Sequence, residues 1–216
     1  MNKNLFLLLA AALLSLSCLK SHAQSFDGGL MAGIVTSQID GDGYSGFHQI
    51  GLTAGVFGRI PTDGPSSWQM ELKYSLFGAH SDVKEVEDLG MNPMDIRLHY
   101  IELPIMFRYD LSRLNISGKS LDFITLEMGL SGDFLVKGTQ SANHENHFDN
   151  PSWLFFSVTG NVGVQLDIND RLGINIRSMY SLTPCRLHPE VPVFSFRHYY
   201  NSVLQATVVY TILHAN

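Results

Sequence analysis

The chain has little cysteine and no long apolar segment beyond its start, and each shortage excludes a class of protein. Only two of its 216 residues are Cys, and Cys18 lies in a segment that we expect to be removed, so Cys185 would have no intrachain partner. A small scaffold held together by disulfides is therefore excluded. No later apolar run approaches the roughly 18 residues of a transmembrane helix. Any insertion into a membrane must use strands.

Positive charge is also scarce. The chain has 14 Lys and Arg against 20 Asp and Glu. The segment that we expect to be removed contains two Lys and no acidic residue, which leaves 12 basic against 20 acidic residues and a net charge of −8. No nucleic-acid partner is expected, because such a surface needs basic residues that replace phosphate counterions.

Residues 1–23 have the pattern of a secretory signal peptide. Lys3 gives a positive start, 5–16 is a largely apolar run too short to span a bilayer as a helix, and Ser21-His-Ala23 is a small-x-small cleavage site. Lipidation at Cys18 is disfavoured, because no Leu stands three residues before it. We predict an exported protein with a signal peptide at 1–23 and one domain at 24–216.

The rest of the sequence alternates apolar and polar residues. In the clearest example Trp68, Met70 and Leu72 alternate with Gln69 and Glu71. Successive side chains of a strand point to opposite faces, so one face is apolar and the other is charged. The predicted strands are nine to seventeen residues long, against about 5 or 6 in globular proteins and about 9 to 11 for a tilted membrane strand. They lie at 28–36, 48–60, 68–79, 97–109, 121–137, 153–168, 171–182 and 198–213.

The connections between these strands favour a membrane barrel. Long connections would gather at one end and shorter ones at the other with both termini, as long extracellular loops and short periplasmic turns do in outer-membrane barrels. The exception is 110–120, which is as long as 37–47. The long set is 37–47, 80–96, 138–152 and 183–197, and the short set is 61–67, 110–120 and 169–170. Aromatic residues would form girdles at both ends: Trp68, Tyr109 and Tyr210 at the short-turn end, and Phe156, Tyr180 and Tyr200 at the long-loop end.

One segment resembles a known family. Tyr100-Ile-Glu-Leu-Pro-Ile-Met-Phe-Arg-Tyr109 is similar to the Tyr-Leu-Glu-Ile-Pro-Leu-Leu-hydrophobic-Lys-Tyr segment of the PorT family, outer-membrane barrels of Bacteroidetes. The likeness extends to Gly29–Gly33, Gly51–Gly55 and Met70–Ser75. It implies an outer-membrane barrel. The founding member is associated with the type IX secretion system, a role of a narrow branch that these motifs do not transfer. The fold class that we predict is all-β, an eight-stranded antiparallel up-and-down transmembrane β-barrel.

The polar face of such a barrel would line its interior. An eight-stranded barrel is just wide enough for side chains to fill it, and an unpaired charge away from water costs several kcal/mol. We therefore expect four cations and four anions to form a lumenal charge network: Arg59, Glu71, Lys73, Glu102, Arg108, Glu127, Asp133 and Arg177. A proton or ion path, or a buried carboxylate catalyst, is the functional alternative, and no spacing selects it. Pro104 lies in mid-strand and predicts a bulge or a local bend toward the lumen.

Other patterns give no specific chemistry. His144, His147 and Asp149 could hold a transition metal, but a loop without fixed geometry or a fourth ligand favours a solvated segment. The acidic loop Ser81–Gly90 lacks the spacing of a calcium loop. No Gly-x-Ser-x-Gly elbow occurs. We predict no catalytic, metal-binding or cofactor-binding residue.

These patterns predict a small monomeric outer-membrane barrel without enzymatic activity. Its partners would be the lipid bilayer and a protein or surface ligand at the long extracellular loops, through which it would have a structural or interaction role. One alternative is a membrane-embedded hydrolase of lipid or lipopolysaccharide, which needs a Ser or Asp close to a His near one rim. The other is a soluble lipocalin-like carrier, in which Glu71, Lys73 and Glu127 would point into water.

Overall fold

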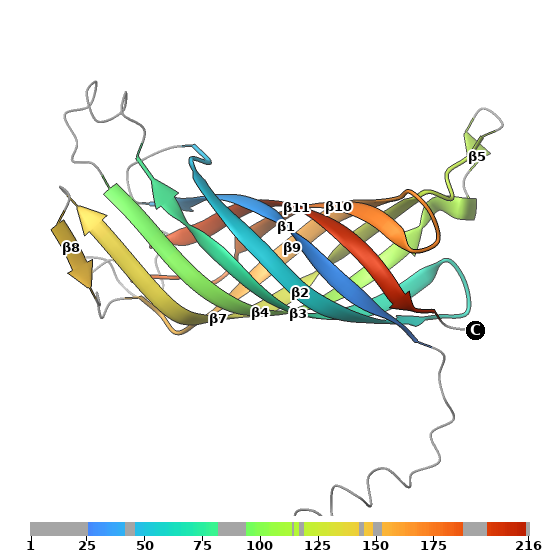
Figure 1. The fold of residues 1–216 in the computed structure, drawn as a ribbon, viewed down its shortest axis with the longest axis horizontal. Coiled ribbons are helices and arrows are strands. Elements are labelled where there is room, and N and C mark those ends of the chain that lie inside the picture. The colour runs from blue at the N-terminus through green and yellow to red at the C-terminus, as the bar shows by residue number, and fades with distance from the viewer. Residues whose placement is uncertain are drawn as a thin grey trace, which may run out of the picture.

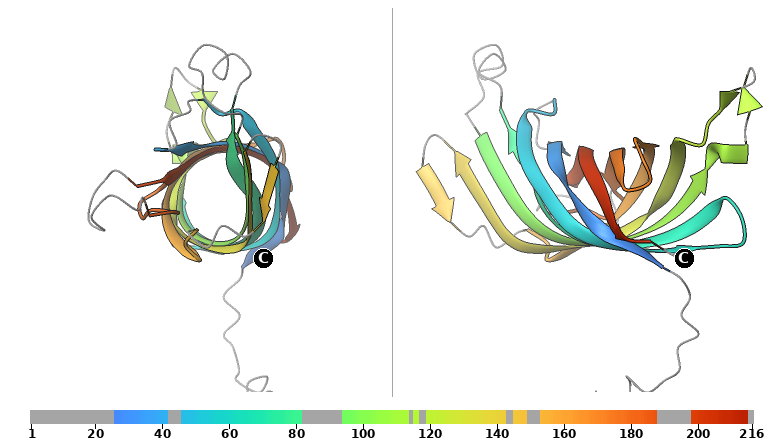
Figure 2. Two further views of the ribbon diagram at one scale, coloured as in Figure 1. Left: turned by 90° about the vertical axis from the view of Figure 1, so that its left-hand side faces the viewer. Right: turned by 45° about the vertical axis from the view of Figure 1, so that its right-hand side comes forward.

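The computed structural model is a closed barrel of eight long antiparallel strands (Figures 1 and 2). It describes residues 26–41, 46–81, 94–113, 115–116, 119–142, 145–148, 153–187 and 198–214. The predicted signal peptide at 1–23 lies outside this part of the chain. The long strands are β1 (Asp27–Asp40), β2 (Gln49–Pro61), β3 (Ser66–His80), β4 (Met94–Asp110), β7 (Ile124–Ala142), β9 (Phe156–Asp167), β10 (Leu172–Ser181) and β11 (Tyr200–Leu213).

Each long strand pairs with the next long strand in the chain, and one further pairing closes the sheet. The first strand, β1, pairs with the last, β11, and β4 pairs with β7 from Met94↔Ala142 to Asp110↔Thr125. The predicted all-β, eight-stranded antiparallel up-and-down barrel is confirmed. Within the described ranges, no helix combines the length and the hydropathy needed to cross a bilayer.

The shorter elements lie beyond the two ends of the barrel. A 3-10 turn, η1 (Leu111–Arg113), and a hairpin of β5 (Asn115–Ile116) and β6 (Lys119–Ser120) follow β4 at the short-turn end. At the long-loop end, β8 (Glu145–Phe148) pairs with the last residues of β7. The prediction of 138–152 as one loop was therefore wrong in part, because β7 continues to Ala142 and β8 folds back on it.

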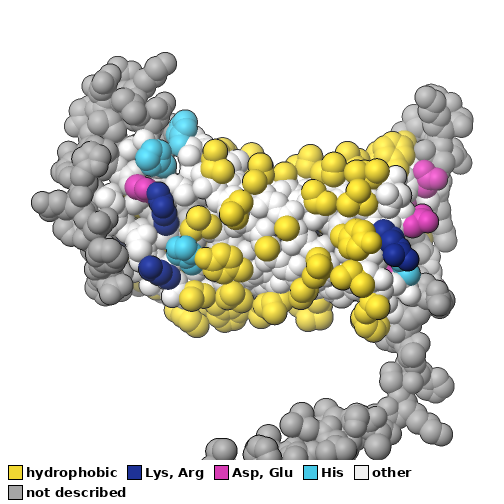
Figure 3. Space-filling model, viewed as in Figure 1, with side chains coloured by type: hydrophobic (Ala, Val, Ile, Leu, Met, Phe, Trp, Pro, Cys, Tyr) yellow, Lys and Arg dark blue, Asp and Glu magenta, His cyan; other side chains and the backbone are white. Residues whose placement is uncertain are grey.

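The predicted faces of the strands are confirmed along the middle of the barrel. Met70 is 62% exposed and Val162 58%, whereas Glu71 and Asn161 are buried inside. On the face that Figure 3 shows, hydrophobic side chains cover the middle of the barrel, a region that we call the apolar belt. The aromatic residues expected in the girdles are also on the outside: Trp68, Tyr109, Tyr210, Phe156 and Tyr180 are exposed, and the half-buried ring of Tyr200 stacks on Tyr180 with centroids 6.2 Å apart.

The prediction of a bulge at Pro104 was wrong. Pro104 pairs with Ser131 in an unshifted register, and the shift in that ladder lies between His99 and Tyr100, opposite Val136. The ladder of β4 with β3 is interrupted beside Pro104 but resumes in the same register. A missing N–H removes a ladder bond without requiring an extra residue.

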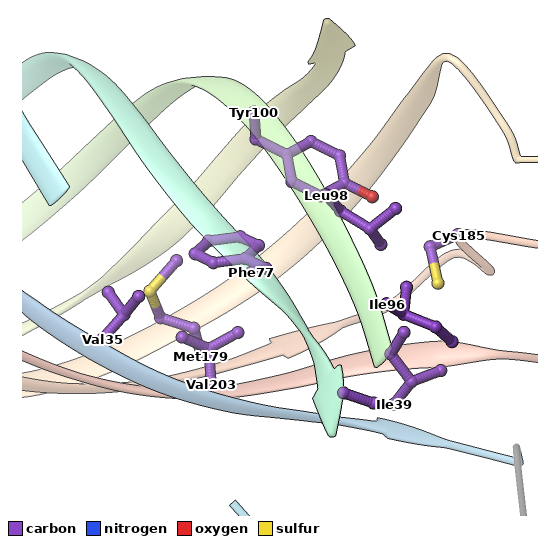
Figure 4. Packing of buried hydrophobic residues seen from close by; sticks show 10 residues of the cluster. Val35, Ile39, Phe77, Ile96, Leu98, Tyr100, Met179, Cys185 and Val203 are labelled. Carbon is purple, nitrogen blue, oxygen red and sulfur yellow. The ribbon is translucent and has the colours of Figure 1, made fainter. Parts of the chain in front are cut away.

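The polarity of the wall inverts toward the long-loop end. In the middle of β4, Leu103 is exposed and Glu102 is buried, but nearer the long-loop end Arg97 is exposed and Leu98 is fully buried. Apolar side chains from several strands fill this part of the interior (Figure 4). This apolar core consists of Val35, Ile39, Phe77, Ala79, Ile96, Leu98, Tyr100, Met179, Cys185 and Val203.

Candidate functional site in the barrel interior

Arg177 is the centre of the polar part of the interior. Its side chain is fully buried, and its Nη1 and Nη2 atoms donate to Glu71 Oε2 at 2.9 Å and Oε1 at 2.8 Å. Its Nε donates to Glu127 Oε1, also at 2.8 Å. Because β10 and β3 stand four places apart in a ring of eight strands, the fork formed by Arg177 and Glu71 joins opposite walls of the barrel.

Glu127, on β7, connects this fork to a second arginine. Arg108 Nη1 donates to Glu127 Oε2 at 3.1 Å and to Gln165 Oε1 at 3.0 Å. Asn175 Nδ2 donates to Glu127 Oε1 at 2.7 Å. Gly163 leaves room for this carboxylate, since a Cβ there would lie 2.8 Å from Glu127 Oε1. Two guanidinium groups and an amide thus saturate one buried carboxylate.

Lys73 extends the polar network toward the apolar core. Its fully buried Nζ donates to Gln205 Oε1 at 2.9 Å and lies 3.5 Å from Glu102 Oε2 and 3.8 Å from Glu71 Oε2. Ser75 Oγ donates to Glu102. The ammonium group is therefore balanced by two carboxylates, which a charge buried away from water requires.

Asp133 is a neighbour of this network rather than a partner of a cation. It lies directly opposite Glu102 in the ladder of β4 with β7, and its carboxylate accepts hydrogen bonds from Ser131 Oγ at 2.8 Å and from Thr159 Oγ1. Among the described residues it makes no ion pair with a Lys or Arg. Hydroxyl donors take the place of a counter-charge here.

Arg59 pairs outside the predicted network. Its Nε and Nη2 both lie 2.8 Å from Asp27 Oδ2. This pair lines an open recess of about 580 Å³ at the short-turn end, which Arg108 and Asp167 also line. Among the described residues, the enclosed interior therefore holds three Lys and Arg side chains, Lys73, Arg108 and Arg177, against the four carboxylates Glu71, Glu102, Glu127 and Asp133.

Two parts of the interior were absent from the sequence prediction. Asp27 stands one residue before the predicted start of the first strand, so Arg59 had no assigned partner. The apolar core was also missed, although the sequence contains a signal for it. Within 96–105, apolar residues occupy even positions up to Tyr100 and odd positions from Ile101 onward.

The described residues bear on two of the predicted alternatives, a metal site and a soluble carrier. In this part of the chain, no group of three or more His, Cys, Asp and Glu side chains could hold a metal ion. The side chains of His144, His147 and Asp149, and the acidic loop beyond Ser81, lie outside the described residues. The soluble lipocalin-like alternative was wrong, because Glu71, Lys73 and Glu127 are buried inside while Met70 and Leu126 are exposed.

A family model described as "Outer membrane protein beta-barrel domain" matches residues 21–185, which is most of the chain. The chain belongs to this family, and it is a protein of the outer membrane. The match runs from before β1 to just beyond β10. The family model is broader than the PorT family, so the narrower resemblance stays a prediction. No curated protein matches the chain.

The chain is also similar to solved structures at low identity. The chain is 11% identical to Ail, the attachment invasion locus protein of Yersinia pestis, crystallised with the heparin analogue sucrose octasulfate; 87% of this chain and 99% of that one are covered, with a TM-score of 0.48. It is also 11% identical to Neisserial surface protein A, covering 86% and 96% of the two chains with a TM-score of 0.46.

Proposed function

We propose that this outer-membrane barrel is a non-enzymatic structural or interaction protein that acts through its surfaces and not through its lumen. The fork of Arg177 and Glu71 across the barrel is the observation that carries this proposal. An ion that passed this level would have to separate buried partners, and breaking a buried pair costs about 3 to 5 kcal/mol. The network of Glu71, Lys73, Glu102, Arg108, Glu127 and Arg177 is then a structural device that holds the walls together.

The apolar core, in the half of the interior toward the long-loop end, also supports a lumen that does not conduct ions. Phe77 and Tyr100 pack with ring centroids 5.3 Å apart, and Leu98 beside them is fully buried. A lining of this kind offers a permeating ion no ligand that could replace its water. Two successive barriers, one ionic and one apolar, therefore oppose conduction.

We propose that contacts with partners are made at the long-loop end, oriented toward the outside. A rigid barrel with short turns at one end and long loops at the other is the usual arrangement of outer-membrane barrels, and loops carry contacts that a packed interior cannot reach. Closure of the sheet by the pairing of β1 with β11 leaves the eight long strands without a free edge, which supports a monomer. The segment Tyr100–Tyr109 supports the narrower PorT likeness. An association with protein secretion would rest on that family resemblance alone, because these motifs do not transfer the role of the founding member.

We also propose that residues 1–23 are a cleaved signal peptide and that 24–216 form the mature domain. The small-x-small site before Gln24 supports this division. Mass spectrometry of the protein purified from outer membranes should give a chain that begins at Gln24, whereas an intact Met1 terminus would contradict it.

The experiment for the main proposal compares conductance and partner contact in the same protein. In planar bilayers the wild-type barrel should give no steps above the lipid baseline. Replacing 143–152 by a short Gly-Ser connection keeps β7 intact and should abolish surface cross-linking to partners, while the folded barrel keeps its heat-modifiable mobility on gels. A stable wild-type conductance, or partner cross-links that survive this replacement and those of 82–93 and 188–197, would overturn it.

A further inference from the structure

Basic side chains gather on the outside of the barrel, just beyond the apolar belt. His99 and Lys137 are directly opposite each other on β4 and β7. Arg97 lies two residues before His99 on β4, nearer the long-loop end. The Arg97 side chain is 57% exposed, and Lys137 is exposed as well. Figure 3 shows Lys, Arg and His side chains at the left-hand end of the belt, which is the long-loop end. We call Arg97, His99 and Lys137 the rim patch.

A bulge in β7 directs Lys137 outward. Asp133 and Leu135 point into the barrel, and strict alternation would direct Lys137 into the apolar core as well. The register shift opposite His99 inserts Val136, so that Val136 and Lys137 are both exposed on the outer face. Bulges that re-aim a side chain are frequent beside functional sites.

An apolar wall lies directly below the rim patch. On β4 and β7, Leu103, Leu130 and Val136 are exposed, Val136 to 64%. At the boundary, the hydroxyl of Tyr74 lies 2.5 Å from Nδ1 of His99. A cationic group above an apolar wall is complementary to an anionic amphiphile, because the charged headgroup can meet the cations and the acyl chains can lie on the wall.

We propose that the rim patch binds the phosphate of an anionic lipid headgroup, with the acyl chains of that lipid against Leu103, Leu130 and Val136. The leaflet is the one at the long-loop end, which is the outer leaflet in the orientation proposed above. This lipid site lies on the barrel wall itself, and it does not depend on any partner that binds at the loops. Guanidinium and ammonium groups are the usual phosphate ligands of proteins.

Asp95 sets the net charge of this surface. Its Oδ2 lies 3.0 Å from Arg97 Nη2, so one carboxylate competes with the headgroup for the guanidinium. On β3, the exposed imidazole of His80 stands opposite Asp95. Arg97 and Lys137 against Asp95 leave an excess of one positive charge among these three side chains. Removing the carboxylate should therefore strengthen binding.

The test uses the full mature chain in phosphatidylcholine vesicles that contain traces of spin-labelled lipid. The quantity measured is the preference of the protein-bound lipid shell for labelled phosphatidic acid over labelled phosphatidylcholine. Wild type should prefer the anionic label. In R97Q/K137Q at low salt, the ratio of bound phosphatidic acid to bound phosphatidylcholine should fall about fivefold for each cation removed. Asp95→Asn should increase the preference. Raising the ionic strength should reduce all of these differences.

The matched control is Arg171→Gln, which removes an exposed cation in the short turn between β9 and β10 at the opposite rim. It should leave the preference unchanged. An equal loss per removed charge in Arg171→Gln and R97Q/K137Q would show diffuse attraction by net charge and overturn the site, as would a wild-type barrel without preference. Heat-modifiable mobility verifies that each variant is folded, and because Arg97 and Lys137 are exposed, their replacement leaves the interior intact.

Discussion

The two halves of the interior are built on opposite principles. In the half toward the short-turn end, ion pairs such as Arg177 with Glu71 fill the lumen and the outside is apolar. In the half toward the long-loop end, Leu98 and Phe77 fill the lumen, and Arg97 and Lys137 lie outside. What surrounds the wall explains the difference. Where lipid surrounds it, apolar side chains face outward; where water surrounds it, the same strands need an apolar core as a soluble protein does.

Strand length shows that both environments are present. β4 has 17 residues and β7 has 19, whereas about 9 to 11 tilted residues cross the hydrocarbon layer. The additional residues lie at the long-loop end, where the ribbons of β4 and β7 reach furthest (Figure 2). Different forces should therefore stabilise the two halves, and substitutions can separate them.

The largest effect is expected in the polar half. Arg177→Met removes the group that neutralises Glu71 and shares Glu127, leaving buried carboxylates undercompensated. We expect a loss of about 3 to 5 kcal/mol in the free energy of unfolding, measured by urea unfolding in lipid vesicles. Arg171→Met, at an exposed turn, is the control and should change little. If the double variant Arg177→Met with Glu71→Leu were no more stable than Arg177→Met alone, unpaired charge would not be the cause.

The next largest loss of unfolding free energy is expected in the apolar half. Two leucines of β4 give the comparison. Leu98→Ala opens a cavity in the apolar core and should cost about 2 to 4 kcal/mol, because Leu98 is fully buried. Leu103→Ala, five residues along β4, exchanges a contact with lipid and should cost less than about 1 kcal/mol. The same unfolding measurement applies. Equal losses would mean that the core does not stabilise the protruding end.

A third prediction uses substitutions on the outer face of the barrel to locate the boundary between lipid and water. Leu130→Arg faces the middle of the apolar belt and should destabilise the barrel by about 2 to 4 kcal/mol. Val136→Arg, next to Lys137 at the rim, should cost about 0 to 1 kcal/mol, because the charge reaches water. Unfolding free energies in vesicles give both values. A larger cost at Val136 than at Leu130 would move the boundary beyond the rim patch.

The fold could be predicted from the sequence because a period of two leaves no ambiguity over long strands. Met70 and Glu71 were assigned to the correct faces, and the strand ends were placed within a few residues. The partners inside the lumen could not be predicted, because alternation gives the face of a side chain and not its position around the ring. Arg177 meets Glu71 from the opposite wall, and Arg59 meets Asp27 instead of the network. The apolar core was missed because one face was assumed to keep one polarity along a whole strand.

The smallest effect tests how tightly the polar network is packed. A Cβ at Gly163 would lie 2.8 Å both from Glu127 Oε1 and from the backbone oxygen of Ile176, so the carboxylate or the neighbouring strand must move. Overpacking of this kind costs about 1 to 3 kcal/mol, and here the displaced group is the one that Arg108 and Arg177 share. Gly58→Ala is the matched control, since a Cβ at Gly58 meets no atom within 4 Å. Urea unfolding should separate the two glycine variants, with Gly58→Ala close to wild type. If Gly163→Ala were equally harmless, Glu127 could shift without loss, and the polar half would tolerate rearrangement that the apolar half, judged by Leu98→Ala, does not.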